Sequence, residues 1–364
     1  MNSDKIITIV GARPQFIKVA PVSNQIRRTT GLREILVHTG QHYDSNMSAV
    51  FFEELGINKP DYNLGISGGS HGAMTGQMLE NIEAVLLQEK PRMVLVYGDT
   101  NSTLAGALAA SKLHIPIAHI ESGLRSFNKR MPEEINRILT DHCSSLLFVP
   151  TNGARENLLR EGIDEAKIVY SGDVMFDACL QFSKALKEHP DCIRRAGLEP
   201  GHYVLSTIHR QENTDQEPRL QAIFEGLAKL NKTIPVLLPL HPRTKSRLEA
   251  VGLMDLALQL NLVDPVGYLD MLAFEKHASA IVTDSGGVQK EAYFNKVPCV
   301  TLRDETEWVE LIDTGWNRLV PPTEGNVICQ EALAAMRSKG QDVTLYGGGK
   351  ASQKVASVID QFLT

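Results

Sequence analysis

The chain has 364 residues, of which 43% are hydrophobic and 22% are charged, and its formal net charge is −6. This length suits two domains better than one, and the negative charge argues against a general nucleic-acid-binding surface. The five cysteines include no CxxC pair, which is typical of reduced thiols in the cytoplasm. The N-terminus lacks the pattern of a signal peptide, and no apolar run approaches the ~20 residues that span a bilayer. We therefore expect a cytoplasmic protein with no nucleic-acid or membrane partner.

The first half of the chain alternates short apolar, β-branched runs with helical patterns. The strand-like runs are residues 5–10, 33–39, 92–98, 115–120 and 145–150. Strands that are buried on both faces of a parallel sheet have this almost continuous apolar composition. The alternation predicts a doubly wound, Rossmann-like α/β domain over residues 1–174.

The same pattern restarts in the second half of the chain. The strand-like runs there are residues 202–208, 234–240, 259–263, 279–283 and 298–302. They predict a second Rossmann-like domain over residues 175–350, and residues 351–364 are expected to form a helix that packs back toward the N-terminal domain. Two such domains are expected to face each other across a cleft. Because open α/β sheets bind ligands at the carboxyl ends of their strands, the loops after the strands are the candidate sites.

The segment TDSGGVQKEA, residues 283–292, follows a predicted strand and opens a helix. Glycine lets the backbone approach an anion, and the free N–H groups of a helix start attract phosphate. The alternative is a tight turn that needs glycine only for its backbone angles. We favour a diphosphate site at Ser285, Gly286 and Gly287, with Glu291 positioned to accept hydrogen bonds from a ribose diol.

The segment VGARPQFIK, residues 10–18, has the same design at the end of the first predicted strand. Gly11 provides the turn, and Arg13 and Lys18 add positive charge near a helix start. The segment lacks both GxGxxG and GxxxxGK[ST], which disfavours a nicotinamide-binding loop and a P-loop. A capped helix with solvated basic residues is the alternative, and we favour contact with an anion.

Asp99 directly follows the predicted strand at residues 92–98. An aspartate in this place commonly caps a helix. Here Asn101 or Ser102 is available for capping, which leaves Asp99 free for another role. A carboxylate buried at a strand end is a candidate proton carrier.

Two histidines of the second half, His209 and His241, follow predicted strands, and each has an arginine close behind it. A single histidine in such a place is more often structural than catalytic. The repeated arrangement favours a function, and His209 beside Arg210 is placed to donate to a leaving phosphate. No HExxH pattern or tight His/Cys cluster occurs, so we expect no metal.

Residues 119–137 combine three carboxylates with four cationic side chains. Glu121 ends a predicted strand as Asp99 does, so both carboxylates are expected at the same edge of the sheet. Glu133 and Glu134 follow Pro132 and suit the first turn of a helix. One of them is expected to stabilise the helix start while the other turns toward the cleft. Several acids around one site allow one carboxyl to stay protonated while another acts as a base. A solvated surface loop is the alternative.

Together these motifs resemble the non-hydrolysing UDP-N-acetylglucosamine 2-epimerases over nearly the whole chain. The resemblance implies two Rossmann-like domains in the GT-B arrangement, a homodimer, and no cofactor. It also implies interconversion of UDP-GlcNAc and UDP-ManNAc by elimination of UDP and re-addition through a 2-acetamidoglucal, feeding bacterial surface polysaccharide synthesis. The matching motifs are GARPQFIK, HTGQHYD, YGDTNSTLAGALAA, HIESGLRS, MPEEINR, GDVMFDA, HRQEN, HPRTK, TDSGGVQKEA and RDETEW.

The resemblance further implies roles for individual residues. The catalytic residues that it implies are Asp99, Glu121, Glu133 and His209. The UDP-sugar contacts that it implies are Arg13, Lys18, His241, Met271, Ser285, Gly286, Gly287 and Glu291, with Met271 near the uracil. A second UDP-GlcNAc, bound as an activator in some bacterial members, would contact Gln41, His42 and Arg210.

The sequence departs from the best-known members at three places, one of which is Met271, where they carry an aromatic residue near the uracil. It has GARPQ where they have GTRPE, and TEWVE, residues 306–310, where they have TERPE. These forms resemble relatives that epimerise UDP-2,3-diacetamido-2,3-dideoxy-glucuronate, which is therefore the alternative substrate. Three other functions remain open: a GT-B glycosyltransferase, a hydrolysing epimerase, and a nucleotide-sugar sensor that binds without turnover.

Overall fold

The computed structural model describes residues 4–41, 52, 55–184, 186 and 191–364. The chain forms two compact units. The first unit comprises Met1–Gln181 and Thr344–Thr364, and the second unit comprises Phe182–Val343. The predicted α/β fold with two Rossmann-like domains is confirmed. No helix in the described ranges is both long and apolar enough to cross a bilayer.

In the described part of the first unit, seven strands form one sheet in the order β3-β2-β1-β4-β5-β6-β7, and each neighbouring pair is parallel. The central strands are apolar because helices cover both faces of the sheet, and Ile7, Val94 and Leu147 are fully buried. The strands are β1 (Lys5–Val10), β2 (Arg33–His38), β3 (Tyr62–Asn63), β4 (Met93–Tyr97), β5 (Ile117–Ile120), β6 (Leu146–Val149) and β7 (Ile168–Tyr170).

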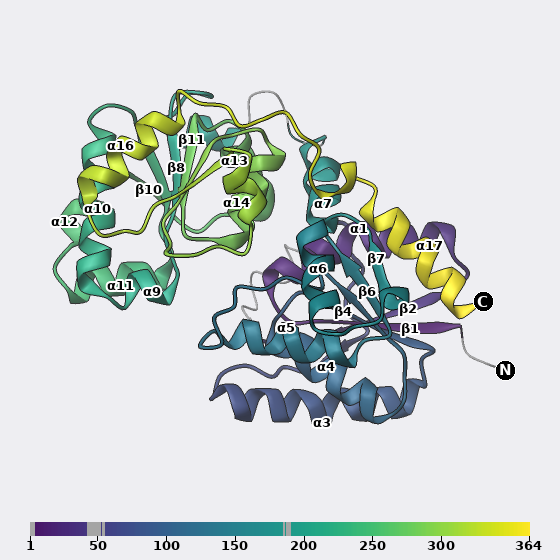
Figure 1. Cartoon of the computed structure of the whole chain (residues 1–364). Coiled ribbons are helices and arrows are strands. Elements are labelled where there is room, and N and C mark those ends of the chain that lie inside the picture. The colour runs from purple at the N-terminus through teal and green to yellow at the C-terminus, as the bar shows by residue number, and fades with distance from the viewer. Residues whose placement is uncertain (1–3, 42–51, 53–54, 185, 187–190) are drawn as a thin grey trace. The chain divides into compact units, whose positions relative to one another are not determined.

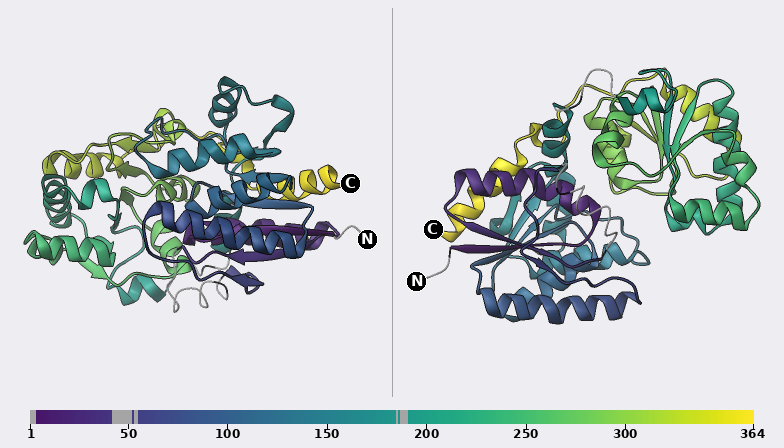
Figure 2. Two further views of the ribbon diagram at one scale, coloured as in Figure 1. Left: turned by 90° about the horizontal axis from the view of Figure 1, so that it is seen from below. Right: turned by 180° about the vertical axis from the view of Figure 1, so that it is seen from behind.

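The helices of the first unit lie on both faces of its sheet, as the right-hand view of Figure 2 shows. Helices α1 and α17 pack together on one face, while α3 and α4 pack together on the other. The helices are α1 (Arg13–Thr29), α3 (His71–Glu89), α4 (Asn101–Lys112), α5 (Pro132–Cys143), α6 (Asn152–Arg160), α7 (Val174–Ser183) and α17 (Ala351–Leu363), with short 3₁₀ turns η1 (Glu165–Lys167) and η2 (Tyr346–Gly348).

The last helix, α17, is tied to the first unit by its packing and by its N-terminus. Its apolar residues Val355 and Ile359 are buried, and the helix lies beside α1 (Figure 1). The backbone N–H groups of Ala351 and Ser352 donate to the carboxylate of Asp177 at 3.1 and 2.7 Å. Because an anion stabilises the positive end of a helix dipole, Asp177 anchors the start of α17 to α7.

In the described part of the second unit, six parallel strands form a sheet in the order β10-β9-β8-β11-β12-β13. The strands are β8 (Val204–Thr207), β9 (Val236–Pro239), β10 (Asn261–Val263), β11 (Ala280–Thr283), β12 (Cys299–Thr301) and β13 (Asn317–Leu319). The helices are α8 (Asp191–Arg195), α9 (Gln211–Thr214), α10 (Glu217–Asn231), α11 (Pro242–Ala250), α12 (Met254–Ala257), α13 (Tyr268–Lys276), α14 (Gly286–Phe294), α15 (Val309–Asp313) and α16 (Gly325–Ala335).

Each sheet has a point where the direction of strand addition reverses. In the first unit this point lies between β1 and β4, and in the second unit it lies between β8 and β11. Open α/β sheets bind ligands at the carboxyl ends of the strands on either side of such a point. The loops after β1, β4, β8 and β11, together with the helices α1 and α14 that follow two of them, carry most of the residues that the sequence selects.

Candidate active site

A buried ion pair joins α1 to the end of β5 in the first unit. Lys18 Nζ contacts Glu121 Oε2, and the two side chains are only 11% and 8% exposed. A Cβ atom added to Gly98, directly after β4, would lie 3.3 Å from the same carboxylate oxygen. The ion pair therefore packs against the end of β4, where Gly98, which has no side chain, leaves space for it. A cation held against a carboxylate favours the ionised form of that carboxylate.

Glu121 has a backbone φ of +69°, a left-handed conformation that residues other than glycine rarely adopt. The N–H groups of Glu121 and Ser122 each donate to the carbonyl oxygen of Phe148 at 3.1 Å, which holds the turn after β5 in place. Strained backbone that its surroundings maintain is concentrated at functional sites. The conformation therefore supports a functional hypothesis for Glu121.

Asp99 is partly accessible at the end of β4, with its side chain 34% exposed. Its carboxylate pairs with Arg137 of α5, and its carbonyl oxygen accepts a hydrogen bond from Asn136 at 2.9 Å. The side chain of Thr100 caps α4, so the expected cap at Asn101 or Ser102 is wrong by one or two residues. Asp99 does not cap the helix and remains available for another role.

The two adjacent glutamates at the start of α5 have different environments. Glu134 is 1% exposed, and its carboxylate accepts hydrogen bonds from the N–H groups of Ser126 and Phe127, each at 2.9 Å. It also lies 3.1 Å from Arg137. Glu133 is exposed on the same helix turn. Glu134 thus orders the preceding loop, and Glu133 is the acid with an accessible carboxylate.

Gln15, which stands where the best-known members have the glutamate of GTRPE, organises the ends of β1 and β4. Its side-chain oxygen accepts hydrogen bonds from the N–H groups of Gly11 and Ala12 at 2.7 and 3.0 Å. Its amide nitrogen donates to the carbonyl oxygen of Tyr97 at 2.8 Å. A carboxylate has no proton to donate to that carbonyl. The amide of Gln15 therefore suits this site better than an ionised glutamate.

The other first-unit candidates lie at the same edge of the sheet. Arg13 is the first residue of α1 and is half-buried. Gln41 follows β2, and its side-chain oxygen accepts hydrogen bonds from the N–H and hydroxyl groups of Ser102 at 3.1 and 2.8 Å. His42, the neighbouring residue of the expected activator site, lies outside the described residues.

In the second unit, the fully buried Asp284 connects the ends of β8 and β11. Its carboxylate accepts hydrogen bonds from the backbone N–H groups of His209 and Arg210, each at 3.1 Å, and from the side chain of Asn213 at 3.1 Å. His209 Nδ1 lies 3.5 Å from the same carboxylate. Asp284, which is not among the residues predicted from the sequence, thus fixes the backbone that presents His209 and Arg210.

The two candidate histidines of the second unit lie close together. The rings of His209 and His241 have centroids 6.1 Å apart. His241 caps α11, since its Nδ1 accepts a hydrogen bond from the N–H of Arg243 at 3.2 Å. Burial, together with the neighbouring His209 and Arg243, lowers the pKa of His241 below its usual value. The arrangement favours a neutral His241 whose Nδ1 is an acceptor.

The N-terminus of α14 has the geometry of an anion site. Ser285 caps the helix, and Gly286 and Gly287 are its first two residues. A Cβ on Gly287 would meet only Ser285 Oγ, at 3.9 Å, so the fold itself leaves room for a side chain there. A Cβ on Gly286 would lie 2.6 Å from Glu307 and 3.7 Å from Arg210 Nη2. Free N–H groups at a helix start with a guanidinium nearby suit a phosphate.

Behind this helix terminus, two carboxyl groups are buried together. Glu291 of α14 is 5% exposed, and Glu275 of α13 is fully buried. Burial and the neighbouring Glu291 raise the pKa of Glu275 well above its usual range, because two like charges cannot both ionise at close range. Met271 is half-buried on the same helix, α13. A glutamate in the apolar sequence MLAFEKHA is the signal that marks Glu275.

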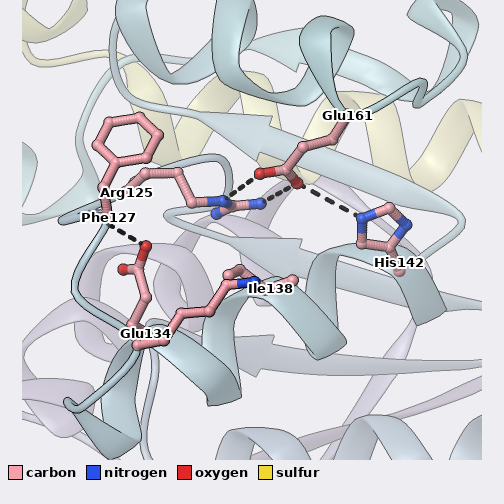
Figure 3. Close-up of a pocket in the computed structure, with 7 residues that line it drawn as sticks. Arg125, Phe127, Glu134, Ile138, His142 and Glu161 are labelled. Atoms are coloured by element: carbon pink, nitrogen blue, oxygen red, sulfur yellow. Dashed lines mark hydrogen bonds and ion pairs between the residues drawn. The ribbon is translucent and has the colours of Figure 1, made fainter.

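A separate pocket lies beside α5 and α6 and contains none of the predicted site residues (Figure 3). Arg125 donates two hydrogen bonds of 2.7 Å to Glu161, and His142 lies 3.4 Å from the same carboxylate. The pocket is lined by Arg125, Phe127, Lys129, Glu134, Ile138, His142 and Glu161.

Within the described ranges, no group of three or more His, Cys, Asp or Glu side chains is arranged to hold a metal ion.

Comparison with known proteins identifies the family. Residues 24–360 match the family model described as UDP-N-acetylglucosamine 2-epimerase. The chain belongs to the UDP-N-acetylglucosamine 2-epimerase family. The resemblance that the motifs carry is thus confirmed, and the family extends over both units.

Relatives within this family differ in the sugar that their names specify. The chain is 54% identical to the UDP-2,3-diacetamido-2,3-dideoxy-D-glucuronate 2-epimerase of Pseudomonas aeruginosa over 98% of this chain and 99% of that protein. It is 45% identical to the UDP-N-acetylglucosamine 2-epimerase of Methanocaldococcus jannaschii, with 98% of each chain covered. A crystal structure of the M. jannaschii UDP-GlcNAc 2-epimerase in complex with UDP-GlcNAc and UDP matches with a TM-score of 0.91 and 44% identity, covering 98% of this chain and 99% of that chain.

Proposed function

We propose that the chain catalyses cofactor-free epimerisation at C2 of a UDP-linked 2-acetamido sugar. The observation that carries the proposal is the pair of strand-end carboxylates, Asp99 and Glu121, each held against a cationic side chain in a member of this family. Removal of a weakly acidic C–H proton requires a base held within reach of it. The two carboxylates are the groups of the first unit best suited to that task.

The proposed chemistry is an elimination followed by an addition. A carboxylate removes the proton from C2, the electron pair of the C2–H bond forms a C1–C2 double bond, and the C1–O bond to UDP breaks. UDP then adds back to C1 while C2 is protonated on the opposite face. Electrons are conserved over the cycle, so no redox partner is consumed.

The proposed roles divide the selected residues into three groups. Asp99, Glu121 and Glu133 transfer protons, and His209 assists the departure of the diphosphate. The UDP-sugar is bound by Arg13, Lys18, His241, Met271, Ser285, Gly286, Gly287 and Glu291. The expected activator residues are Gln41 and Arg210, together with His42. The pairing of Lys18 with Glu121 supports a shared place for these two residues, and the helix terminus at Ser285 supports diphosphate binding.

We propose UDP-2,3-diacetamido-2,3-dideoxy-D-glucuronate as the preferred substrate. Support comes from the 54% identity to the Pseudomonas aeruginosa enzyme, against 45% to the M. jannaschii UDP-GlcNAc enzyme. The GARPQ and TEWVE forms of two motifs also favour the diacetamido uronate. UDP-GlcNAc, with UDP-ManNAc as its product, is the second candidate, because several relatives carry that name.

A direct assay separates the substrates and the competing functions. The purified chain is incubated with each UDP-sugar alone, without any acceptor, and the products are followed by proton NMR. The proposal predicts a C2 epimer that remains attached to UDP, formed faster from the diacetamido uronate. Free sugar and UDP would indicate a hydrolysing epimerase. Binding without any product would favour a glycosyltransferase or a sensor.

Three broader proposals go beyond the reaction itself. We propose that the chain forms a homodimer, acts in the cytoplasm, and supplies an epimerised sugar for bacterial surface polysaccharide. All five cysteines are free, as expected for a reducing compartment. Light scattering of the purified chain tests the homodimer directly, and a monomer mass would contradict it.

A further inference from the structure

A buried network of hydrogen-bonded side chains lies beneath the loops that carry Asp99 and Glu121. His119 of β5 and Asp141 of α5 are almost completely buried. His119 Nδ1 lies 2.7 Å from Asp141 Oδ1, and His119 Nε2 lies 2.7 Å from the carbonyl oxygen of Gly98. Both ring nitrogens therefore make short, well-defined contacts, and the proposed proton-transfer mechanism uses neither of them.

Both partners of His119 accept hydrogen bonds. The Gly98 carbonyl has no proton to donate. The other oxygen of Asp141 accepts the N–H of Gly123 at 3.1 Å and lies 2.8 Å from Arg125 Nη1. Burial alone would raise the pKa of Asp141, but His119 and Arg125 outweigh it and hold the pKa below its usual value. With a guanidinium and a backbone N–H on its other oxygen, Asp141 is an ionised acceptor independently of His119.

The number of N–H donors on an imidazole ring then decides the protonation state of His119. A neutral ring has one N–H donor and one acceptor nitrogen, whereas the imidazolium has two donors. With an acceptor at each nitrogen, a neutral His119 would leave a buried lone pair facing an oxygen atom. The groups facing it are compatible with a cation, because Asp141 is ionised and Glu161 balances Arg125 at 2.7 Å.

His38 provides an internal contrast. It is a second buried histidine of the same sheet, 2% exposed at the end of β2. Its ring stacks on Phe16 with centroids 5.0 Å apart, and its Nδ1 has no hydrogen-bond partner among the described residues. Burial lowers the pKa of His38. The structure therefore places a neutral histidine and a doubly donating histidine in one sheet.

His119 and Asp141 contact the two turns that carry Asp99 and Glu121, the proposed proton-transfer residues. Gly98 immediately precedes Asp99, and Gly123 lies two residues after Glu121. We infer that His119 carries a proton on both ring nitrogens and, together with Asp141, acts as a positioning residue that fixes the turns holding Asp99 and Glu121. The positioning role rests on the proposed 2-epimerase function, whereas the protonation state does not.

The protonation state is tested on the unmodified protein. Nitrogen NMR of a sample with ¹⁵N-labelled histidine distinguishes protonated from unprotonated ring nitrogens, and the signals of His119 are assigned by their loss in His119→Gln. At about pH 8, where an ordinary histidine is neutral, both nitrogens of His119 should give the protonated signature. His38 should show one protonated and one unprotonated nitrogen. A neutral pattern for His119 overturns the inference.

The positioning role is tested by turnover. His119→Gln should lower kcat at least ~10-fold while KM changes little, because misplaced catalytic groups cost rate more than binding. His142→Gln, the same substitution at an exposed position next to Asp141, should keep kcat within twofold of the unmodified enzyme. A folded His119→Gln sample with unchanged kcat overturns the role. If the unmodified chain turns over neither UDP-sugar, the proposed function fails and the positioning role fails with it, while the NMR result on His119 still stands.

Discussion

Several acids of the two units have different kinds of partner. In the first unit, Glu121 contacts Lys18, Asp99 contacts Arg137, and Asp141 lies between His119 and Arg125. In the second unit, Asp284 accepts backbone N–H groups, and Glu275 faces another carboxyl group, Glu291. These acids therefore face cations in the first unit, and backbone donors or another carboxyl group in the second unit.

The contrast is sharpest at two equivalent aspartates. Asp99 follows β4 and Asp284 follows β11, each beside the reversal point of its sheet. Asp284 is fully buried, and its carboxylate is occupied by backbone and amide donors, whereas Asp99 remains 34% exposed. Position at a strand end therefore does not by itself identify a catalytic acid. Exposure and the type of partner distinguish these two aspartates.

The largest expected effect comes from removing a cation-paired acid at a strand end. Glu121→Gln and Asp99→Asn keep the size of the side chain and remove its ionisable group. Each should lower kcat by ~10²-fold or more, the usual scale for a general acid or base. Affinity for UDP should change little, and both quantities are measured by steady-state kinetics and calorimetry. Near-normal kcat in both variants would remove the proposed difference between the two units.

A second large effect is expected at the start of α14. Gly287→Val should abolish UDP binding and leave the fold intact, because its Cβ has open space in the protein but would enter the predicted diphosphate site. Gly153→Val is the matched control. Gly153 is also the second residue of its helix, and its Cβ would meet a capping oxygen at 3.8 Å. Calorimetric titration with UDP should show no binding in the first variant and normal binding in the second. Equal UDP affinities in the two variants would indicate that Gly287 serves only the conformation of the turn.

A smaller difference is expected between the neighbouring acids of α5. Glu133→Gln should lower kcat ~10-fold or more and leave the melting temperature unchanged, because the side chain is exposed. Glu134→Gln should have a milder effect on kcat and a lower melting temperature, because its carboxylate accepts two loop N–H groups. Parallel kinetics and thermal unfolding test this pair. The reverse pattern would exchange the two assignments.

The smallest effects concern stability against pH. Asp141 has a lowered pKa in the folded state, so its stabilisation is present above the unfolded value of about 3.9 and is lost as the pH falls. Glu275 has a raised pKa, so the folded state loses stability as the pH rises above about 4.3. Denaturant unfolding should show the advantage of the unmodified chain over Asp141→Asn shrinking in acid. Glu275→Gln should gain on the unmodified chain as the pH rises, and a constant difference would contradict the assignment.

The sequence predicts the central strands for a clear physical reason. Buried parallel strands are continuous apolar runs, and each run selected by the sequence contains a strand of the structure. The edge strands β3, β7 and β13 are not predicted, because they are only two or three residues long and partly exposed. Parallel topology then brings the residues that follow β4 and β5 to one edge of the sheet.

Local sequence patterns do not predict the partners of the candidate site residues. Lys18 and Glu121 are 103 positions apart, and His209 and Asp284 are 75 positions apart. Their pairing depends on the order of strands in the sheet, which periodicity does not reveal. Gln15 shows the same limit, because its amide bridges segments 82 positions apart. The sequence therefore indicates which residues follow strands, and the fold decides which of them meet a cation, a backbone donor or another acid.

The central claim is proton abstraction from C2 of a UDP-sugar, and solvent exchange tests it most directly. The purified enzyme is incubated with UDP-2,3-diacetamido-2,3-dideoxy-D-glucuronate, and separately with UDP-GlcNAc, in D2O, and the product is examined by NMR. The account predicts an epimer that carries deuterium at C2. An epimer that retains its original hydrogen at C2 would contradict the account.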